Sequence, residues 1–466
     1  MAIERTPGIK LLFVALIGAA LVIPLLMVYG LVSDRQHQSR TSQQSITAGW
    51  GAQQVISGPV LAIPYTSERV QTENVDGKSI TRTVKVRDEL FLSPQSQKVT
   101  SEIDPDVKQR SIYTAVIYNA RLGGEARFAL PEDLERSGVA RGKLLLNEAE
   151  LRFGASDPRG LQADAKVTAN GEKLALKPGK GVAASGGSGF HGLVDWSGEG
   201  QLVVDWSYSL RGSHGLSLVP RGGETIWEVK SPWPHPSFTG SFLPEPEGTE
   251  VTGEGFTASW SFTNLALGQA MVMTEDPGPP VIGDGAMEYA TAAAMERGGS
   301  GTSMAATIAL VEPVDVYSQV DRAVKYGFLF IGFTFLAFFM FDIIGGAKVA
   351  AAEYLLTGAG LILFFVLLLA FAELIGFVLA YVLASASIIG LLTAYSAAVL
   401  GSWLRARVIG GLLVGLYALL YVLLNLEAFS LIIGSVLLFF ALAGVMYATR
   451  NIDWSSVGRK QEVDAT

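Results

Sequence analysis

One run of residues, from Val324 to Ile344, limits what this chain can fold into more than any other feature. Its sequence, VKYGFLFIGFTFLAFFMFDII, has about 21 residues, nearly all of them apolar. A helix rises about 1.5 Å per residue, so about 20 apolar residues cross the roughly 30 Å hydrocarbon core of a bilayer. The run therefore predicts a transmembrane helix. It separates a largely polar part of the chain from a largely apolar part.

Five more apolar segments have a length suited to crossing a bilayer. They are Leu11–Val32, Glu353–Ala372, Leu374–Tyr395, Val408–Leu424 and Ala428–Tyr447. A cleaved signal peptide is the alternative interpretation of the first segment, but that segment is too long for one and lacks an Ala-x-Ala site. We interpret residues 1–32 as a cytoplasmic N-terminus with an anchor helix, and residues 33–49 as a polar linker, in which Ser33–Thr47 forms either a short helical stalk or an irregular connection. The five later spans, in residues 323–448, are expected to form a transmembrane bundle.

Lys and Arg residues are unevenly distributed between the two ends of these six spans. With the N-terminus in the cytoplasm, the cytoplasmic segments hold eight cations and the two short outer turns hold none. The eight are Arg5, Lys10, Lys348, Arg405, Arg407, Arg450, Arg459 and Lys460. Short loops rich in Lys and Arg stay in the cytoplasm. The pattern predicts that both termini are cytoplasmic, including a tail over residues 449–466, and that residues 33–322 are periplasmic.

The part between the first two spans, residues 50–322, has the alternation of apolar and polar residues that is typical of β-strands. Apolar residues occupy every second position from Leu202 to Leu210, and again from Phe256 to Phe262. Asp76-Gly77 is a strong signal for a hairpin turn. One buried and one solvated face per strand predicts a large antiparallel β-sandwich, either single or double. The predicted fold class is therefore a membrane protein with α and β content.

Composition excludes several classes of site. The chain has no cysteine, which rules out disulfides, thiolate metal sites and cysteine nucleophiles. Its net charge is −8 and its Lys and Arg residues form no cluster, so we expect no nucleic acid partner. The four histidines are scattered, without the short spacing of a zinc site. We expect no metal and no other cofactor.

The segment Ser231–Pro244, SPWPHPSFTGSFLP, is a candidate contact loop. Its four prolines remove backbone donors, so it is not expected to form a central strand. In an extended loop, Trp233, His235 and Phe238 would project and could stack on a sugar, a lipid or a peptide. The alternative is that Trp233 and Phe238 plug the rim of the sandwich.

Four carboxylates lie in or at the ends of the expected spans: Asp342, Glu353, Glu373 and Glu427. Charged residues in such positions are costly and often functional, so they are candidates for an ion or proton relay. The alternative is that each one sits at a hydrated helix end. No inverted repeat, which would favour a transporter, is visible in the sequence.

Five stretches of the chain resemble the CreD family of inner-membrane proteins, which is associated with integrity of the cell envelope. They are Ser57–Tyr65, Ser231–Pro244, Val320–Phe335, Glu353–Glu373 and Thr449–Trp454. Because they are spread over nearly the whole chain, the resemblance applies to the full architecture. It implies location in the bacterial inner membrane, a periplasmic β domain and a role in tolerance of envelope stress. The family brings no assigned catalytic residues.

We therefore expect a non-enzymatic protein whose β domain binds an envelope glycan, a lipid or another envelope protein, with the bilayer itself as a further partner. A transporter or flippase that uses the membrane carboxylates is the alternative. A third possibility is a glycan hydrolase, which would need two acids among Asp157, Asp195 and Asp205 at about 5–10 Å from each other.

Overall fold

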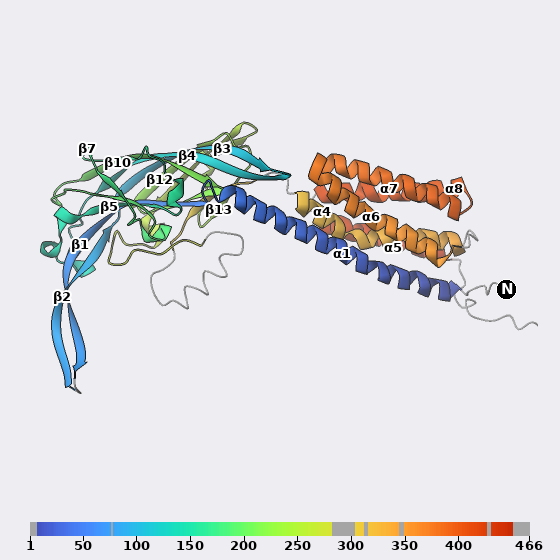
Figure 1. The fold of residues 1–466 in the computed structure, drawn as a ribbon, viewed down its shortest axis with the longest axis horizontal. Coiled ribbons are helices and arrows are strands. Elements are labelled where there is room, and N and C mark those ends of the chain that lie inside the picture. The colour runs from blue at the N-terminus through green and yellow to red at the C-terminus, as the bar shows by residue number, and fades with distance from the viewer. Residues whose placement is uncertain are drawn as a thin grey trace, which may run out of the picture. The chain divides into compact units, whose positions relative to one another are not determined.

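The computed structural model describes residues 7–75, 78–281, 303–311, 316–343, 349–425 and 430–450. It divides the chain into two compact units. One unit, here called the helical unit, comprises Met1–Thr41 and Val314–Thr466, and the other, the β unit, comprises Ser42–Pro313. The chain is thus a membrane protein with an N-terminal apolar helix, a large β domain and further apolar helices, as predicted (Figure 1).

The N-terminal helix α1 (Pro7–Thr47) is much longer than the predicted anchor. Its 41 residues form one helix with Pro24 inside it, which corresponds to a length of about 60 Å, twice the thickness of the hydrocarbon core. Most of the predicted linker is therefore helical. We call this polar part of α1, Ser33–Thr47, the stalk.

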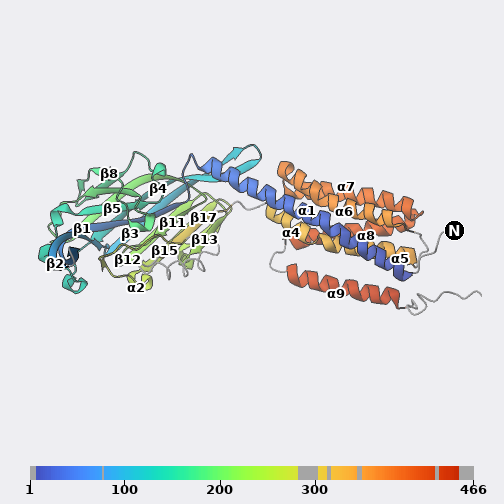
Figure 2. The same cartoon turned by 60° about the horizontal axis from the view of Figure 1, so that its bottom comes forward.

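The remaining helices of the helical unit follow the predicted spans closely. They are α4 (Val316–Lys325), α5 (Gly327–Ile343), α6 (Ala351–Ile375), α7 (Phe377–Val399), α8 (Trp403–Asn425) and α9 (Ser430–Thr449). Among the described residues, five helices are long and apolar enough to cross a membrane, with α4 and α5 counted together. The last helix, α9, contributes only a shorter described apolar stretch, so the sixth span stays a prediction (Figure 2).

The second span begins earlier than its hydrophobicity suggests. The short helix α4 precedes α5, and the chain leaves helical geometry only at Tyr326. On α4, Tyr317, Val320 and Val324 are buried, and Asp321 and Lys325 form an ion pair at 2.7 Å beside this buried face. This amphipathic pattern at a span end is typical of a helix at the boundary between lipid and water.

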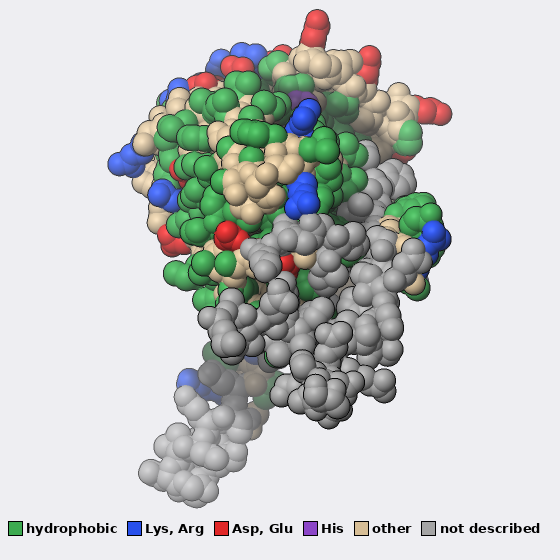
Figure 3. Space-filling view, turned by 90° about the vertical axis from the view of Figure 1, so that its right-hand side faces the viewer, with side chains coloured by type: hydrophobic (Ala, Val, Ile, Leu, Met, Phe, Trp, Pro, Cys, Tyr) green, Lys and Arg blue, Asp and Glu red, His purple; other side chains and the backbone are tan. Residues whose placement is uncertain are grey.

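Small residues allow the helices to approach one another, as expected in lipid. Leu21 of α1 leaves no room for a Cβ at Gly358 of α6. Leu25 lies only 2.7 Å from where a Cβ of Gly327 would be. Hydrophobic side chains gather over a large part of the described surface in this view (Figure 3).

The described part of the β unit forms two sheets. The nine-stranded sheet contains β1 (Gln54–Val75), β2 (Lys78–Leu92), β5 (Glu150–Ala155), β8 (Leu176–Pro178), β9 (Gly189–Leu193), β11 (Gly215–Val219), β13 (Pro236–Gly240), β16 (Val272–Met273) and β17 (Ala306–Leu310). The eight-stranded sheet contains β3 (Ser96–Arg110), β4 (Tyr113–Phe128), β6 (Lys166–Ala169), β7 (Glu172–Lys173), β10 (Leu202–Ser213), β12 (Glu224–Ser231), β14 (Glu250–Thr252) and β15 (Gly255–Thr263). Short helical turns connect them: η1 (Leu134–Ser137), η2 (Arg141–Lys143), η3 (Leu146–Glu148), η4 (Pro158–Gly160), η5 (Ala183–Ser185), η6 (Pro246–Gly248) and α2 (Asn264–Leu267).

Both sheets contribute to one main hydrophobic core, so the domain is a single sandwich. The predicted apolar face of β10 is buried, with Trp206 and Tyr208 inside. Trp227 of β12 stacks on Trp260 of β15 with 4.6 Å between ring centroids. Most strand pairs are antiparallel as predicted, but β1 pairs in parallel with β11, and β3 with β12.

A long hairpin of β1 and β2 extends from the edge of the sandwich (Figure 1). The two strands pair continuously from Leu61 and Leu92 to Val75 and Lys78. Ile63 and Leu90 are fully buried, whereas Val70, farther out, is 69% exposed. We call the outer part, Thr66–Val75 with Lys78–Arg87, the arm. The predicted turn Asp76-Gly77 lies outside the described residues.

Candidate functional site

The candidate contact segment Ser231–Pro244 lies at an edge of the nine-stranded sheet. Residues Pro236–Gly240 form strand β13, which pairs with β17, and β17 in turn pairs with β11 (Figure 2). The prediction of a loop is therefore wrong for these five residues. Prolines exclude a segment from the middle of a sheet, but β13 is an edge strand. An edge strand forms hydrogen bonds on one side only, so it tolerates proline.

The three predicted contact residues differ in how they are held. Phe238 packs edge-to-face on Phe256 and Trp260, with centroid distances of 5.7 and 5.6 Å, so it closes the rim of the core. Trp233 is half-buried, and its indole N–H donates a hydrogen bond of 3.1 Å to the carbonyl oxygen of Val311. His235 is exposed. Trp233 and Phe238 both pack against the core, as in the alternative in which they plug the rim, whereas part of Trp233 and the side chain of His235 stay exposed.

The membrane carboxylates lie in different places. On α6, Glu353 is in the first turn and Glu373 near the end, and 20 residues of helix between them correspond to about 30 Å. Asp342, near the end of α5, is 6% exposed. Glu427 lies outside the described residues. The structure does not bring Glu353 and Glu373 into one site.

Each described carboxylate has local partners. Glu373 accepts a hydrogen bond of 3.2 Å from the hydroxyl of Tyr317, and its Oε1 lies 4.0 Å from Nε of Arg35. Glu353 accepts a hydrogen bond of 2.7 Å from the N–H of Ala350, at the start of its own helix. Asp342 accepts one of 3.4 Å from the N–H of Val349. Backbone N–H groups at a helix start have no partner within the helix. Glu353 accepts a hydrogen bond from one of them, which is a common way for an acidic residue to stabilise a helix.

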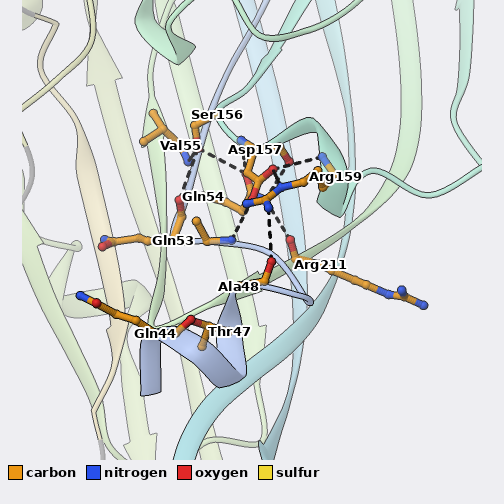
Figure 4. Close-up of polar contacts among 11 residues, drawn as sticks. Gln44, Thr47, Ala48, Gln53, Gln54, Val55, Ser156, Asp157, Arg159 and Arg211 are labelled. Carbon is orange, nitrogen blue, oxygen red and sulfur yellow. Dashed lines mark hydrogen bonds and ion pairs between the residues drawn. The ribbon is translucent and has the colours of Figure 1, made fainter. Parts of the chain in front are cut away.

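A polar network that the sequence did not reveal lies where α1 leads into β1 (Figure 4). We call it the junction. Gln54 is fully buried, and its Nε2 donates to the carbonyl oxygens of Asp157 and Arg211 at 3.1 and 2.9 Å. Its Oε1 accepts from the N–H of Asp157 at 3.1 Å. One glutamine side chain therefore holds together segments that are more than 100 residues apart.

The carboxylate of Asp157 forms the second part of the junction. It accepts hydrogen bonds from the N–H of Ala52 at 3.0 Å and from Nε and Nη2 of Arg159 at 2.9 and 2.7 Å. Arg159 also reaches the carbonyl oxygen of Ala48, just after α1, at 3.3 Å. The hydrogen bonds from Arg159 lower the pKa of Asp157 to about 2, against the opposing effect of burial. A carboxylate with such a pKa is ionised at neutral pH and is not a general acid.

Trp50 completes the junction on its exposed side. Its indole N–H donates to the carbonyl oxygen of Tyr118 at 3.2 Å, and the guanidinium of Arg211 lies 4.5 Å from its ring centroid. The residues between the end of α1 and the start of β1 are thus bound to β4, β10 and η4.

The three acids considered for glycan hydrolysis differ in their surroundings. Asp157 is used in the junction, and Asp195 and Asp205 are exposed. A different pair, Glu89 and Glu150, is bridged by the buried guanidinium of Arg152. Although burial opposes it, hydrogen bonds from Lys180 and Arg152 lower the pKa of Glu150. Glu150 therefore lacks the raised pKa that an acid catalyst needs.

The described residues contain no group of three or more His, Asp or Glu side chains that would hold a metal ion.

The outer face of the eight-stranded sheet carries an open groove of about 800 Å³ over β3, β4, β12 and β15. Its charges are mostly paired across strands, as in the 2.7 Å ion pair of Glu102 with Arg121. It is a polar surface without aromatic lining.

Comparison with known proteins identifies the family. A family model described as inner membrane protein CreD matches residues 6–455. The chain belongs to the CreD family. The inner membrane protein CreD of Escherichia coli (strain K12) is 31% identical over 450 residues, which are 94% of this chain and 92% of that protein. The match covers both the helical unit and the β unit and confirms the resemblance. The chain is thus an inner-membrane protein with several membrane-spanning helices, and the family description names no catalytic activity.

Proposed function

We propose that this CreD-family protein maintains the cell envelope under stress by binding an envelope component through its β domain, without catalysis. The observation that carries the proposal is the geometry around Trp233 and His235. The indole N–H of Trp233 donates to the carbonyl oxygen of Val311, and part of the ring packs against the core. The side chain is therefore held in place, and the rest of its apolar surface is left for a partner. The exposed imidazole of His235 lies two residues away. A fixed aromatic platform beside a polar group favours stacking on a sugar ring or an apolar group, because little entropy is lost on binding.

The prolines of the segment affect which binding mode fits. An open sheet edge is a template for adding a foreign strand, and prolines at an edge oppose this. Pro232, Pro234 and Pro236 surround the platform. Recognition through side chains is therefore favoured over strand addition.

The proposal places the β domain in the periplasm and both termini in the cytoplasm. Arg405 and Arg407 support this orientation, because they lie at the start of α8, and short segments with such cations stay in the cytoplasm. Glu373 lies at the end of α6 that is then periplasmic.

The chain has no cysteine, so single cysteines test the orientation cleanly. Leu265→Cys, at a position 86% exposed in the β domain, should react with a membrane-impermeant maleimide in intact spheroplasts. Ser402→Cys, in the turn between α7 and α8, should react only after lysis. Labelling in the opposite pattern would refute the orientation.

Complementation of a deletion strain under envelope stress tests the binding site. Trp233→Ala and His235→Ala together should abolish rescue at normal membrane abundance. Leu265→Ala removes an exposed apolar side chain elsewhere in the same domain and is the matched control. Full rescue by the double variant would refute this contact site.

A transporter or flippase remains the second candidate function, and the burial of Asp342 favours it. Charged groups inside spans often line a transport path. Glu373 argues against this role, because Tyr317 and Arg35 already hold its carboxylate.

A further inference from the structure

The helical unit contains an apolar cleft between α1 and α5. Its volume is about 320 Å³. Val14, Gly18 and Val22 line one wall, and Phe328, Gly332 and Leu336 line the other. All of its lining residues are apolar or glycine. A polar solute would lose its hydrogen bonds with water there without replacement, which excludes it as an occupant.

The cleft exists because α1 packs closely over only part of its length. From Leu21 onward, α1 buries Leu21, Leu25, Val28 and Val32, whereas no side chain between Leu11 and Ala20 is buried. Two glycines deepen the space. A Cβ at Gly332 would meet no atom within 4 Å, and one at Gly18 would meet only Phe335, at 3.9 Å.

The length of the cleft matches one leaflet of a bilayer. On α5 the lining extends from Phe328 to Phe339, which is about 16 Å of helix. Half of the hydrocarbon core is about 15 Å. A single extended acyl chain therefore fits its length and its chemistry.

One end of the cleft carries a positive charge. Lys325 is one turn before Phe328, and Tyr29 is one turn after Leu25. The Nζ of Lys325 lies 6.0 Å from the ring centroid of Tyr29. Its side chain is 57% exposed, and Asp321 accepts one hydrogen bond from it at 2.7 Å. An ammonium has three donors, so Lys325 can also bind a phosphate at the mouth of the cleft.

We propose that the cleft binds an anionic glycerophospholipid, with one acyl chain between α1 and α5 and the phosphate at Lys325. The apolar lining selects the chain, and the cation at one end selects the anionic headgroup. This lipid would be a bound ligand of α1, the helix that continues into the stalk. The inference does not depend on what the β domain binds.

Photocrosslinking of the full-length protein in nanodiscs tests the proposal. The discs contain phosphatidylethanolamine and a trace of phosphatidylglycerol with a diazirine in its acyl chain. Crosslinks should concentrate in the peptides that contain Leu11–Leu25 and Phe328–Phe339. Gly332→Leu and Gly18→Leu, which fill the cleft from opposite walls, should each lower this labelling about tenfold, equivalent to about 1.4 kcal/mol.

Gly415→Leu is the control for the cleft, because Gly415 is an exposed glycine of α8 with open space around it. It should leave the labelling unchanged. Lys325→Gln should remove the preference for labelled phosphatidylglycerol over labelled phosphatidylethanolamine. Uniform labelling of all spans, or labelling of both glycine variants as in the unchanged protein, would overturn the proposal. Crosslinks to a second copy of the chain in place of lipid would overturn it too. Gel filtration shows whether the glycine variants fold. If neither does, the test rests on which peptides of the unchanged protein are crosslinked and on whether Lys325→Gln removes the preference for phosphatidylglycerol.

Discussion

At the scale of single residues, Asp157 carries the largest share of the junction. Its carboxylate accepts four hydrogen bonds, one from Ala52 and three from Arg159, and it is 7% exposed. Removing a partner from a buried polar group leaves the remaining groups unsatisfied, which costs more than the hydrogen bonds contribute when present. The junction is therefore a point where one substitution has a large effect.

Asp157→Ala should destabilise the protein by about 1–3 kcal/mol, because the N–H of Ala52 and the guanidinium of Arg159 lose their acceptor. We expect a lower Tm in thermal unfolding followed by tryptophan fluorescence. Asp205→Ala, at an exposed position, should leave Tm within error. Equal Tm values for the two variants would contradict the role of the junction.

The pH dependence of this contribution follows from the lowered pKa of Asp157. The pKa is about 2 in the folded protein and about 3.9 in an unfolded chain. The unfolded state therefore binds the proton first as the pH falls. The stabilisation is complete above about pH 4 and is lost toward pH 2, so the Tm difference between Asp157→Ala and the unchanged protein should shrink over that range.

Single-residue roles were the least predictable from the sequence. Trp233, His235 and Phe238 could be selected because four prolines set their segment apart. How each side chain is held could not be predicted from the sequence, because the hydrogen-bond partner of Trp233 is 78 residues away. The role of Asp157 in the junction could not be predicted either, because its hydrogen bond with Ala52 joins residues that are 105 positions apart.

At the scale of elements, the stalk is a case in which the sequence left two forms open and the structure has the helical one. A stretch rich in Gln and Ser has no hydrophobic period, and its composition suits a linker. It is helical because it continues the helix of the span, so no new nucleation is needed. The stalk also has helical contacts of its own, such as Gln38 to Asp34 at 2.8 Å.

Hydrogen exchange distinguishes a helical stalk from a flexible linker. We expect the amides of Ser33–Thr47 to exchange slowly. Arg40→Pro should speed their exchange strongly, because proline inside a helix costs about 3 kcal/mol. Arg40→Ala, which keeps the backbone donor at the same exposed position, is the control. Fast exchange in the unchanged protein would contradict the helix.

Other elements were predictable from local chemistry. The turn between α6 and α7 is at Gly376, close to the boundary between two spans expected from the sequence, and its φ of +78° favours glycine. The alternation in β10 gave the correct buried face. The parallel pairing of β1 with β11 was not predictable, because about 160 residues separate the partners and alternation does not identify a neighbour.

At the scale of the whole molecule, the membrane carboxylates separate the two candidate functions. A variant with Asp342→Asn, Glu353→Gln, Glu373→Gln and Glu427→Gln should fully rescue a deletion strain under envelope stress. The reason is that Glu353 and Glu373 have local partners at opposite ends of one helix, which is not the arrangement of a relay. Membrane abundance, measured by blot, is the control.

Loss of rescue at normal abundance would make transport the leading function. Single substitutions would then identify the carboxylate that matters. Because Glu373 also bonds Tyr317, loss of rescue with low abundance would indicate a folding defect, which the single variant Asp342→Asn avoids.

The arm of β1 and β2 extends the β unit well beyond the sandwich (Figure 1). Ten residues of strand, from Thr66 to Val75, correspond to about 34 Å, which is close to the diameter of a small domain. Its pairing is confined to its own two strands in the described part of the chain. The arm therefore carries two strands out of the sandwich by about the width of a folded domain, with no other strand of the described chain beside them.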